Sequence, residues 1–129
     1  MTVLADTHVL QWWSAEPAKL SPSATKALAG ADEIAVSAIS WYELAWLAGR
    51  GRIVIVTPVR SWLDTLARQV RTAGISPAIA DTAASLPQSF PGDPADRLIY
   101  ATAVELGWQL VTKDKGMRDH PQPREITVW

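Results

Sequence analysis

The sequence predicts an α/β fold, a three-layer sandwich in which a central, mostly parallel sheet of four to five strands is flanked by helices. Two observations favour this class. Short aliphatic and β-branched runs alternate with longer segments of helical periodicity, and most helical segments begin at a recognisable cap. Strands that alternate with helices build parallel sheets with helices on both faces. With 48% hydrophobic and 19% charged residues, the 129-residue chain is expected to form a single domain over residues 1–129.

Caps and hydrophobic spacing predict the elements in the first half of the chain. Ser21 and Pro22 suit the N-cap and first position of a helix that Gly30 ends. Ser40 and Glu43 have the spacing of a capping box and predict another helix start. The predicted elements are a strand over 2–5, a helix over 7–14, a helix over 22–29, a strand over 34–36 and a helix over 40–49.

The second half continues this alternation, and Asp93-Pro94 is its most persuasive helix start. The β-branched run Ile53–Val56 is expected to be a strand, and Pro58 to open a helix that Gly74 closes. The predicted elements are a strand over 53–56, a helix over 58–73, an extended segment over 75–79, a helix over 80–85, a helix over 93–106, a strand over 109–112, at most a helical turn over 115–118 and a strand over 125–129.

Composition excludes several kinds of chemistry. The chain has no cysteine, which removes disulfides, thiolate nucleophiles, iron–sulfur clusters and cysteine-based zinc sites. Its two histidines, His8 and His120, are too few for a histidine-rich metal site. The formal charge of −1 argues against a broad basic face, so a nucleic acid would have to bind through a local patch or through a bound metal. No membrane span or signal peptide is expected, which predicts a cytoplasmic protein.

Carboxylates recur at the strand-to-helix turns, which a parallel sheet gathers at one edge. They are Asp6, Glu43, Asp93, Asp96 and Asp114. Taken singly, each is explained as a helix cap or as an anion in a first helical turn. Taken together they would repel one another, and Arg97 and Lys113 are too few cations to offset five carboxylates. A divalent cation is therefore expected among them.

Oxygen ligands without cysteine or a histidine pair favour Mg²⁺ or Mn²⁺ over zinc. A metal of this kind lowers the pKa of a bound water and stabilises the charge that develops on a phosphate. The expected chemistry is phosphodiester hydrolysis. A P-loop nucleotidase is excluded because the chain has no Gly-rich Lys-Ser/Thr turn.

Four segments in order along the chain carry a family resemblance. They are Leu4–His8 (LADTH), Ser40–Ala45 (SWYELA), Asp93–Ala103 (DPADRLIYATA) and Leu110–Asp114 (LVTKD). Together they resemble the motifs of PIN domains, and most closely those of VapC-type toxins of bacterial type II toxin–antitoxin systems. The resemblance implies a PIN-like fold and an endoribonuclease that cuts RNA with Mg²⁺ or Mn²⁺ and leaves a 5′-phosphate. It also implies a homodimer that a VapB-like antitoxin neutralises.

The resemblance places the catalytic, metal-binding carboxylates on Asp6, Glu43, Asp96 and Asp114. Asp6, Asp96 and Asp114 are expected to hold the metal. Glu43 is expected to ligate it too and to orient or deprotonate the attacking water. Supporting or substrate-contacting roles are expected at Asp93, Thr112, Arg97 and Thr7. The chain has Pro91-Gly92 where a histidine often occurs in relatives, which bears on substrate positioning.

Several alternatives stay open at this stage. The chain is either an active nuclease or a catalytically inactive PIN-like module that binds RNA or a protein partner. An aspartyl-phosphate phosphatase is disfavoured because His8 stands where that class needs a second aspartate. Arg97 is expected either to contact the scissile phosphate or to pair with nearby acids. The sequence leaves the RNA that is cut undefined.

Two surface features are also expected. A basic rim around the acids is predicted from Arg50, Arg52, Lys113, Lys115 and Arg118. The seven tryptophans exceed what a core of this size absorbs easily, so some are expected to line a dimer contact or an antitoxin groove. Base stacking is the less favoured alternative for them.

Overall fold

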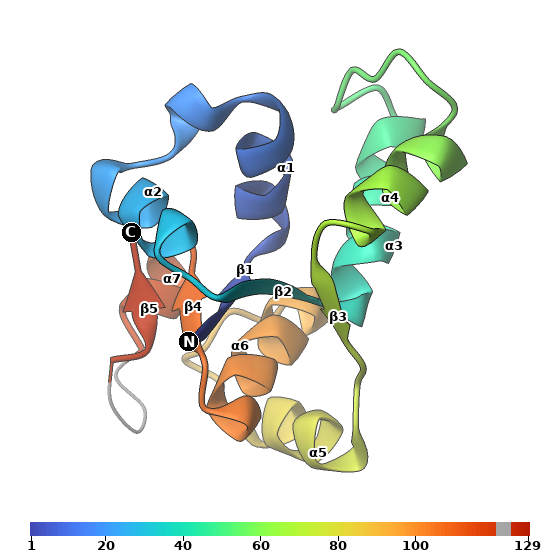
Figure 1. Cartoon of the computed structure of the whole chain (residues 1–129). Coiled ribbons are helices and arrows are strands. Elements are labelled where there is room, and N and C mark those ends of the chain that lie inside the picture. Colours follow the sequence, from blue (N-terminus) through green and yellow to red (C-terminus); the bar gives the residue numbers. More distant parts are fainter. Residues whose placement is uncertain (121–124) are drawn as a thin grey trace.

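The computed structural model contains a five-stranded, wholly parallel sheet with helices on both faces (Figure 1). It describes residues 1–120 and 125–129. The strand order is β3-β2-β1-β4-β5, so the first strand of the chain lies at the centre of the sheet. The strands are β1 (Thr2–Ala5), β2 (Glu33–Ser37), β3 (Arg71–Ala73), β4 (Gln109–Val111) and β5 (Thr127–Val128). The predicted α/β class and parallel sheet are confirmed.

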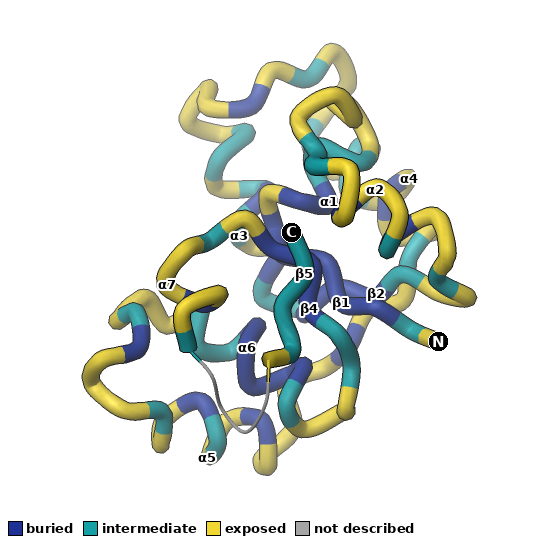
Figure 2. Tube along the Cα trace, turned by 90° about the vertical axis from the view of Figure 1, so that its left-hand side faces the viewer, coloured by how far each residue is buried: buried dark blue, intermediate teal, exposed yellow. Residues whose placement is uncertain are grey.

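Alternation along β1 divides the core into two layers. Val3 and Ala5 point to one face of the sheet and belong to the cluster that α1, α2, α3 and α4 cover. Leu4 points to the other face and packs with residues of α6 and α7. The helices are α1 (Thr7–Ala15), η1 (Pro17–Lys19), α2 (Pro22–Ala29), α3 (Ala38–Gly49), α4 (Val59–Ala67), α5 (Pro77–Ser85), α6 (Pro94–Leu106) and α7 (Lys115–Arg118). Figure 2 shows the buried residues concentrated in the central strands and along α6.

Two predicted helix starts are confirmed, and so are the predicted ends of these two helices at residues 29 and 106. The Ser21 side chain accepts a hydrogen bond from the Ala24 amide and caps α2. The Asp93 side chain accepts one from the Ala95 amide and caps α6. Gly107 ends α6 at φ 68°, a left-handed conformation that glycine adopts without steric cost.

The predicted capping box at the start of α3 is wrong. Strand β2 extends to Ser37, and this residue itself caps α3, accepting a hydrogen bond from the Ile39 amide. Ser40 therefore lies inside the helix, where it is fully buried. Because the cap is three residues earlier than predicted, Glu43 is free of the capping role and turns its carboxylate toward α1.

The predicted position of the third strand, taken from its β-branched signal, is wrong. Residues 53–56 form no strand: Ile53 is buried, but Val54 and Val56 are 90% and 100% exposed. The strand is Arg71–Ala73 instead, because α4 ends at Ala67, well before the predicted stop. An extended segment over 75–79 is also wrong, since α5 begins at Pro77, and the closing strand is limited to Thr127–Val128. None of these differences lies at a turn that carries one of the predicted site carboxylates.

Candidate active site

The centre of the site is built where β1 and β4 end side by side. Asp6 directly follows β1, and its carboxylate accepts a hydrogen bond from the Thr7 amide at 2.7 Å, which caps α1. Its other oxygen accepts a bond from the Thr112 hydroxyl at 2.7 Å. Thr112 directly follows β4 and is fully buried, and the Asp6 amide donates to the Val111 carbonyl at 3.0 Å. Two strand ends are thus locked together, with Asp6 held between them.

Thr7 connects this centre to α3. Its hydroxyl donates to the Glu43 carboxylate at 2.5 Å and lies 2.9 Å from the Ser40 hydroxyl. Burial raises the pKa of Glu43, the Thr7 hydrogen bond opposes that rise, and the charges of Asp6 and Asp93 add to it. The sequence predicts only a capping role for Ser40, and the position of α3 against α1 reveals its contact with Thr7.

Asp96 lies in the first turn of α6 and faces the same group of acids. Burial is the largest cause that raises its pKa, to about 7, and the charges of the other four carboxylates raise it further. Burial likewise raises the pKa of Asp6, against the opposing hydrogen bonds from Thr112 and Thr7. No hydrogen bond reaches the Asp96 carboxylate from the described residues. The other four acids therefore lie close enough to Asp96 to oppose its ionisation.

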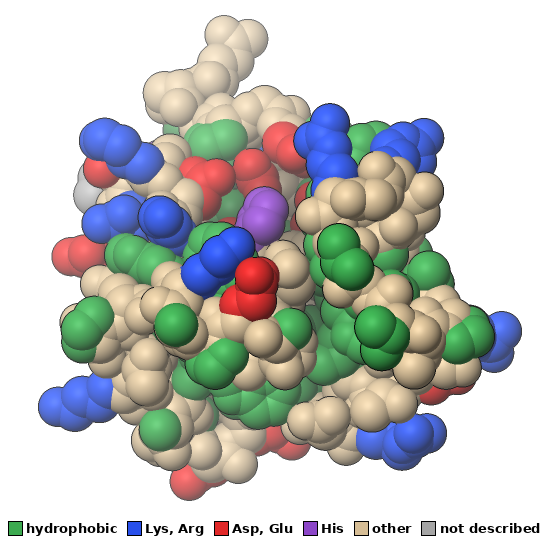
Figure 3. Space-filling model, turned by 90° about the horizontal axis from the view of Figure 1, so that it is seen from above, with side chains coloured by type: hydrophobic (Ala, Val, Ile, Leu, Met, Phe, Trp, Pro, Cys, Tyr) green, Lys and Arg blue, Asp and Glu red, His purple; other side chains and the backbone are tan. Residues whose placement is uncertain are grey.

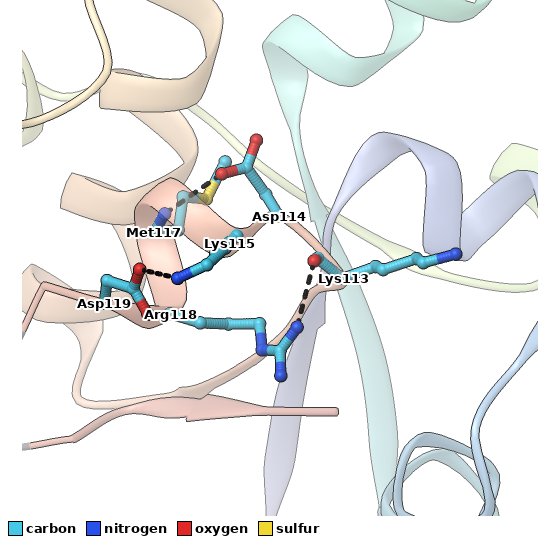
Figure 4. Close-up of polar contacts among 6 residues, drawn as sticks. All are labelled: Lys113, Asp114, Lys115, Met117, Arg118 and Asp119. Atoms are coloured by element: carbon cyan, nitrogen blue, oxygen red, sulfur yellow. Dashed lines mark hydrogen bonds and ion pairs between the residues drawn. The ribbon is translucent and has the colours of Figure 1, made fainter.

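Asp114 and Asp93 combine capping with a place in this group. Figure 4 shows the Asp114 carboxylate accepting a hydrogen bond from the Met117 amide, at 3.0 Å, as the cap of α7. The Asp114 amide in turn donates to the Thr112 hydroxyl at 3.0 Å. Asp93 caps α6 and is exposed. The capping explanation thus holds for Asp6, Asp93 and Asp114, and it coexists with their gathering at one edge.

Arg97 takes neither of its predicted roles. Its guanidinium donates five hydrogen bonds, all to backbone carbonyls and none to a carboxylate. The acceptors are the carbonyls of Ala83, Leu86, Pro87, Phe90 and Pro91. Since a guanidinium has five N–H groups, the side chain is fully used in fixing the α5–α6 connection. It is not placed to pair with the acids or to contact a phosphate.

Among the described residues, none of the cations of the predicted rim forms an ion pair with the five acids. The Lys113 side chain extends toward α1 (Figure 4), where its ammonium lies 5.7 Å from the centre of the Trp12 ring. Lys115 pairs with Asp119, and Arg118 donates to the Lys113 carbonyl. Figure 3 looks onto this end of the molecule and shows acidic side chains with Lys and Arg side chains on both sides of them.

The donor chemistry of the site fits a hard divalent cation. It offers carboxylate and hydroxyl oxygens, and within residues 1–120 and 125–129 no ion pair engages Asp6, Glu43, Asp93, Asp96 or Asp114. Among the same residues, no three carboxylates or imidazoles are arranged as a ready-made metal cage. A cation bound by these oxygens would therefore also need waters and substrate phosphates as ligands, as Mg²⁺ typically does.

A hollow beside the acids is a feature that the sequence does not predict. A cavity of about 440 Å³ lies between α3 and the start of α6 and is lined by Glu43 and Asp93 together with Tyr42 and Trp46. The sequence gives no reason to single out Tyr42, because a tyrosine next to an acid forms no recognisable motif.

In the part of the chain that the structure describes, no helix is long and apolar enough to span a membrane.

Comparison with known proteins places this architecture in a family. The model of the PIN domain matches residues 3–122. The chain therefore belongs to the PIN domain family, as its motifs predicted.

One relative and two solved structures match most of the length of the chain. Ribonuclease VapC22 of Mycobacterium tuberculosis (strain ATCC 25618 / H37Rv) is 63% identical over 128 residues, which cover 99% of this chain and 98% of that protein. VapBC2 from Rickettsia felis, solved bound to a DNA fragment from its promoter, matches with a TM-score of 0.71 and 18% identity over the whole of both chains. VapBC-1 from nontypeable Haemophilus influenzae matches with a TM-score of 0.66 and 17% identity over 88% of this chain and 87% of that one. At these identities the two structures confirm the PIN-like fold.

Proposed function

We propose that the chain is an endoribonuclease, the toxin of a bacterial toxin–antitoxin pair, which hydrolyses RNA phosphodiester bonds at an acidic Mg²⁺ or Mn²⁺ site. The relative named as a ribonuclease VapC supports this proposal through 63% identity along the whole chain. The observation that carries it is a group of carboxylates that form no ion pair with the described residues, in which burial and the neighbouring charges raise the pKa of Asp96 to about 7. If this edge of the sheet had only a structural role, neutral caps would make it more stable by avoiding repulsion among carboxylates. A bound cation offsets that repulsion.

The proposed ligands are Asp6, Asp96 and Asp114, joined by Glu43. When bound, the metal supplies an activated water and stabilises the charge that develops on the phosphate. Thr112 fixes the Asp6 carboxylate through its hydroxyl. Thr7 holds the Glu43 carboxylate, which then accepts the proton of the attacking water. Burial raises the pKa of Glu43, which makes its carboxylate a stronger base than an ordinary glutamate.

We further propose that residues 1–129 act as one PIN-like domain in the cytoplasm, as a homodimer bound by a VapB-like antitoxin. The complex from Klebsiella pneumoniae, named as a toxin–antitoxin complex, shares the fold with a TM-score of 0.64, at 23% identity over 87% of this chain. The connection between α3 and α4 supplies an apolar contact surface, since Val54 and Val56 are almost fully exposed.

The test is cleavage of a mixed RNA by the purified chain with Mg²⁺, with Mn²⁺ and with a chelator. Asp6→Asn and Asp96→Asn are expected to lower the cleavage rate at least a hundred-fold, roughly the effect of removing a charge-stabilising group. Circular dichroism confirms that the variants are folded, and the products are expected to carry 5′-phosphates. Wild-type rates in the folded double variant would refute the assignment of the site.

A calorimetric titration with Mg²⁺ separates this function from an inactive PIN-like module. Heat of binding that disappears in Asp96→Asn supports a metal-dependent enzyme. A chain that binds RNA but shows neither metal binding nor cleavage is the inactive module, and the proposed hydrolysis is then wrong.

A further inference from the structure

The cavity beside the carboxylates is large enough for one planar ligand group. Its volume of about 440 Å³ lies within the range of small-molecule pockets. Glu43, Asp93 and Thr7 line its inner side, so it is continuous with the proposed catalytic site. A ligand in this cavity would therefore lie next to carboxylates of the proposed catalytic site.

Two large side chains on the outer side of this cavity are not accounted for by the fold. Tyr42 is 65% exposed and Trp46 is 37% exposed, and neither belongs to the clusters that form the core. They stand four residues apart on α3, so they are neighbours on one face of the helix. Trp41, on the adjacent face, does pack against the core, which shows that α3 can bury a tryptophan where stability requires it. The exposed pair offers aromatic surface on the wall of the cavity.

Positive charge lies next to this aromatic surface. The Arg50 guanidinium is 4.2 Å from the centre of the Trp46 ring, and that of Arg52 is 5.8 Å from it. Both arginines are exposed, and neither takes part in an ion pair between described residues. These cations therefore keep their charge available to an anion beside the Trp46 ring.

We propose that this cavity is a nucleobase subsite: it holds one unstacked base of the RNA next to the scissile phosphodiester, on the faces of Tyr42 and Trp46, while Arg50 and Arg52 meet the adjoining backbone phosphate. The inference rests on the proposed ribonuclease function and names a selectivity element for it. Aromatic faces and cations in combination are the usual means of binding unpaired RNA. Stacking area then decides the preference, and purines are favoured over pyrimidines.

The experiment measures binding separately from cleavage. Asp96→Asn is used as the background so that the RNA stays intact, and fluorescence anisotropy follows labelled tetranucleotides that carry an abasic site at each position in turn. Adding Trp46→Ala is expected to weaken binding of the intact RNA by roughly 5- to 100-fold, the range found for loss of one base–aromatic stack. An abasic site at one position is expected to abolish this difference in affinity between the background protein and its Trp46→Ala derivative. Trp46→Phe is expected to restore most of the affinity.

The control is Ile75→Ala, which trims an exposed apolar side chain outside the cavity and is expected to leave the affinity unchanged. Equal losses with intact and abasic RNA, or no loss on Trp46→Ala, would overturn the subsite. If Trp46→Ala leaves RNA binding unchanged but weakens self-association in light scattering, the cavity is a contact between copies of the chain and the inference is wrong.

The outcome is distinguishable from failure of the proposed function. Base-dependent binding without metal-dependent cleavage by the wild-type chain keeps the subsite and refutes the hydrolysis. Cleavage with equal kcat/KM for all four bases at every position keeps the hydrolysis and refutes the subsite.

Discussion

Replacing Asp96 by asparagine removes a carboxylate whose ionisation is opposed by burial first and by the neighbouring acids second. Its pKa rises from an ordinary value of 3.8 to about 7. A rise of that size corresponds to about 4 kcal/mol at full effect. Asp96 is only half-buried, and screening by water reduces this to about 2 kcal/mol. Asp96→Asn is therefore expected to be about 2 kcal/mol more stable than wild type at pH 8 without metal.

The pH dependence fixes the sign of this prediction. Because the folded-state pKa is raised, the folded protein holds the Asp96 proton more tightly than the unfolded chain does. The contribution of protonated Asp96 to stability is then fully present below about pH 4 and is lost as the pH rises through about 7. The difference between variant and wild type is expected to grow over this window. Urea unfolding in a chelator, at intervals between pH 4 and 8.5, measures it.

Added Mg²⁺ is expected to reverse the order of stabilities. A ligand at a hundred times its dissociation constant stabilises a folded protein by about 2.7 kcal/mol, and Asp96→Asn lacks a proposed ligand and gains less. Asp81→Asn, which neutralises an exposed carboxylate on α5, is the control and should follow the wild type under all conditions. Parallel curves for wild type and Asp96→Asn from pH 4 to 8.5 without metal would refute the electrostatic reasoning.

Three further substitutions test how the site is held. Thr112→Val removes the hydroxyl that donates to Asp6 and should lower the free energy of unfolding by about 1–3 kcal/mol in urea at pH 8; a change under about 0.5 kcal/mol contradicts this. Arg97→Lys cannot reach five carbonyls at once and should cost about 2–4 kcal/mol, again by urea unfolding, and stability equal to wild type would show that one ammonium suffices. Gly116→Ala places a Cβ 2.6 Å from a proline ring and 3.1 Å from the Asp114 carboxylate, so RNA cleavage should fall roughly tenfold or more, whereas Gly74→Ala, in open space, should leave the rate unchanged. Equal rates in the two alanine variants would exclude this close packing as a determinant of the site.

Much of the fold follows from local signals that the tertiary structure does not override. The helix of Asp93-Pro94 begins and ends as predicted because both its cap and its terminal Gly107 are local features. The third strand was not predictable in this way. Its three residues, Arg71–Ala73, include two polar ones and carry no apolar run. They become a strand by pairing with β2, whereas the β-branched run 53–56 forms no strand.

The candidate site, like the fold, was predictable only in part. Parallel topology alone places the strand-end acids at one edge, so their gathering was predictable from their order in the chain. Side-chain partners were not predictable, because they depend on how helices approach one another. The contact between Thr7 and Ser40 joins two helices across 33 residues of sequence. Arg97 acts as a brace because the α5–α6 connection folds back over it, which brings carbonyls 6 to 14 residues away within reach of its guanidinium.

Capping and catalysis are compatible explanations for the aspartates at the strand-to-helix turns. The helices that serine caps in the same chain can be compared with those that aspartate caps. A serine side chain is sufficient to cap three of its helices, at Ser21, Ser37 and Ser76. An aspartate caps three others, at Asp6, Asp93 and Asp114. All three aspartate caps lie in the group of acids that raises the pKa of Asp96, where a neutral cap would avoid repulsion altogether. Helix capping alone gives no reason for the charge at this edge, and a role that requires negative charge, such as holding a cation against RNA, does.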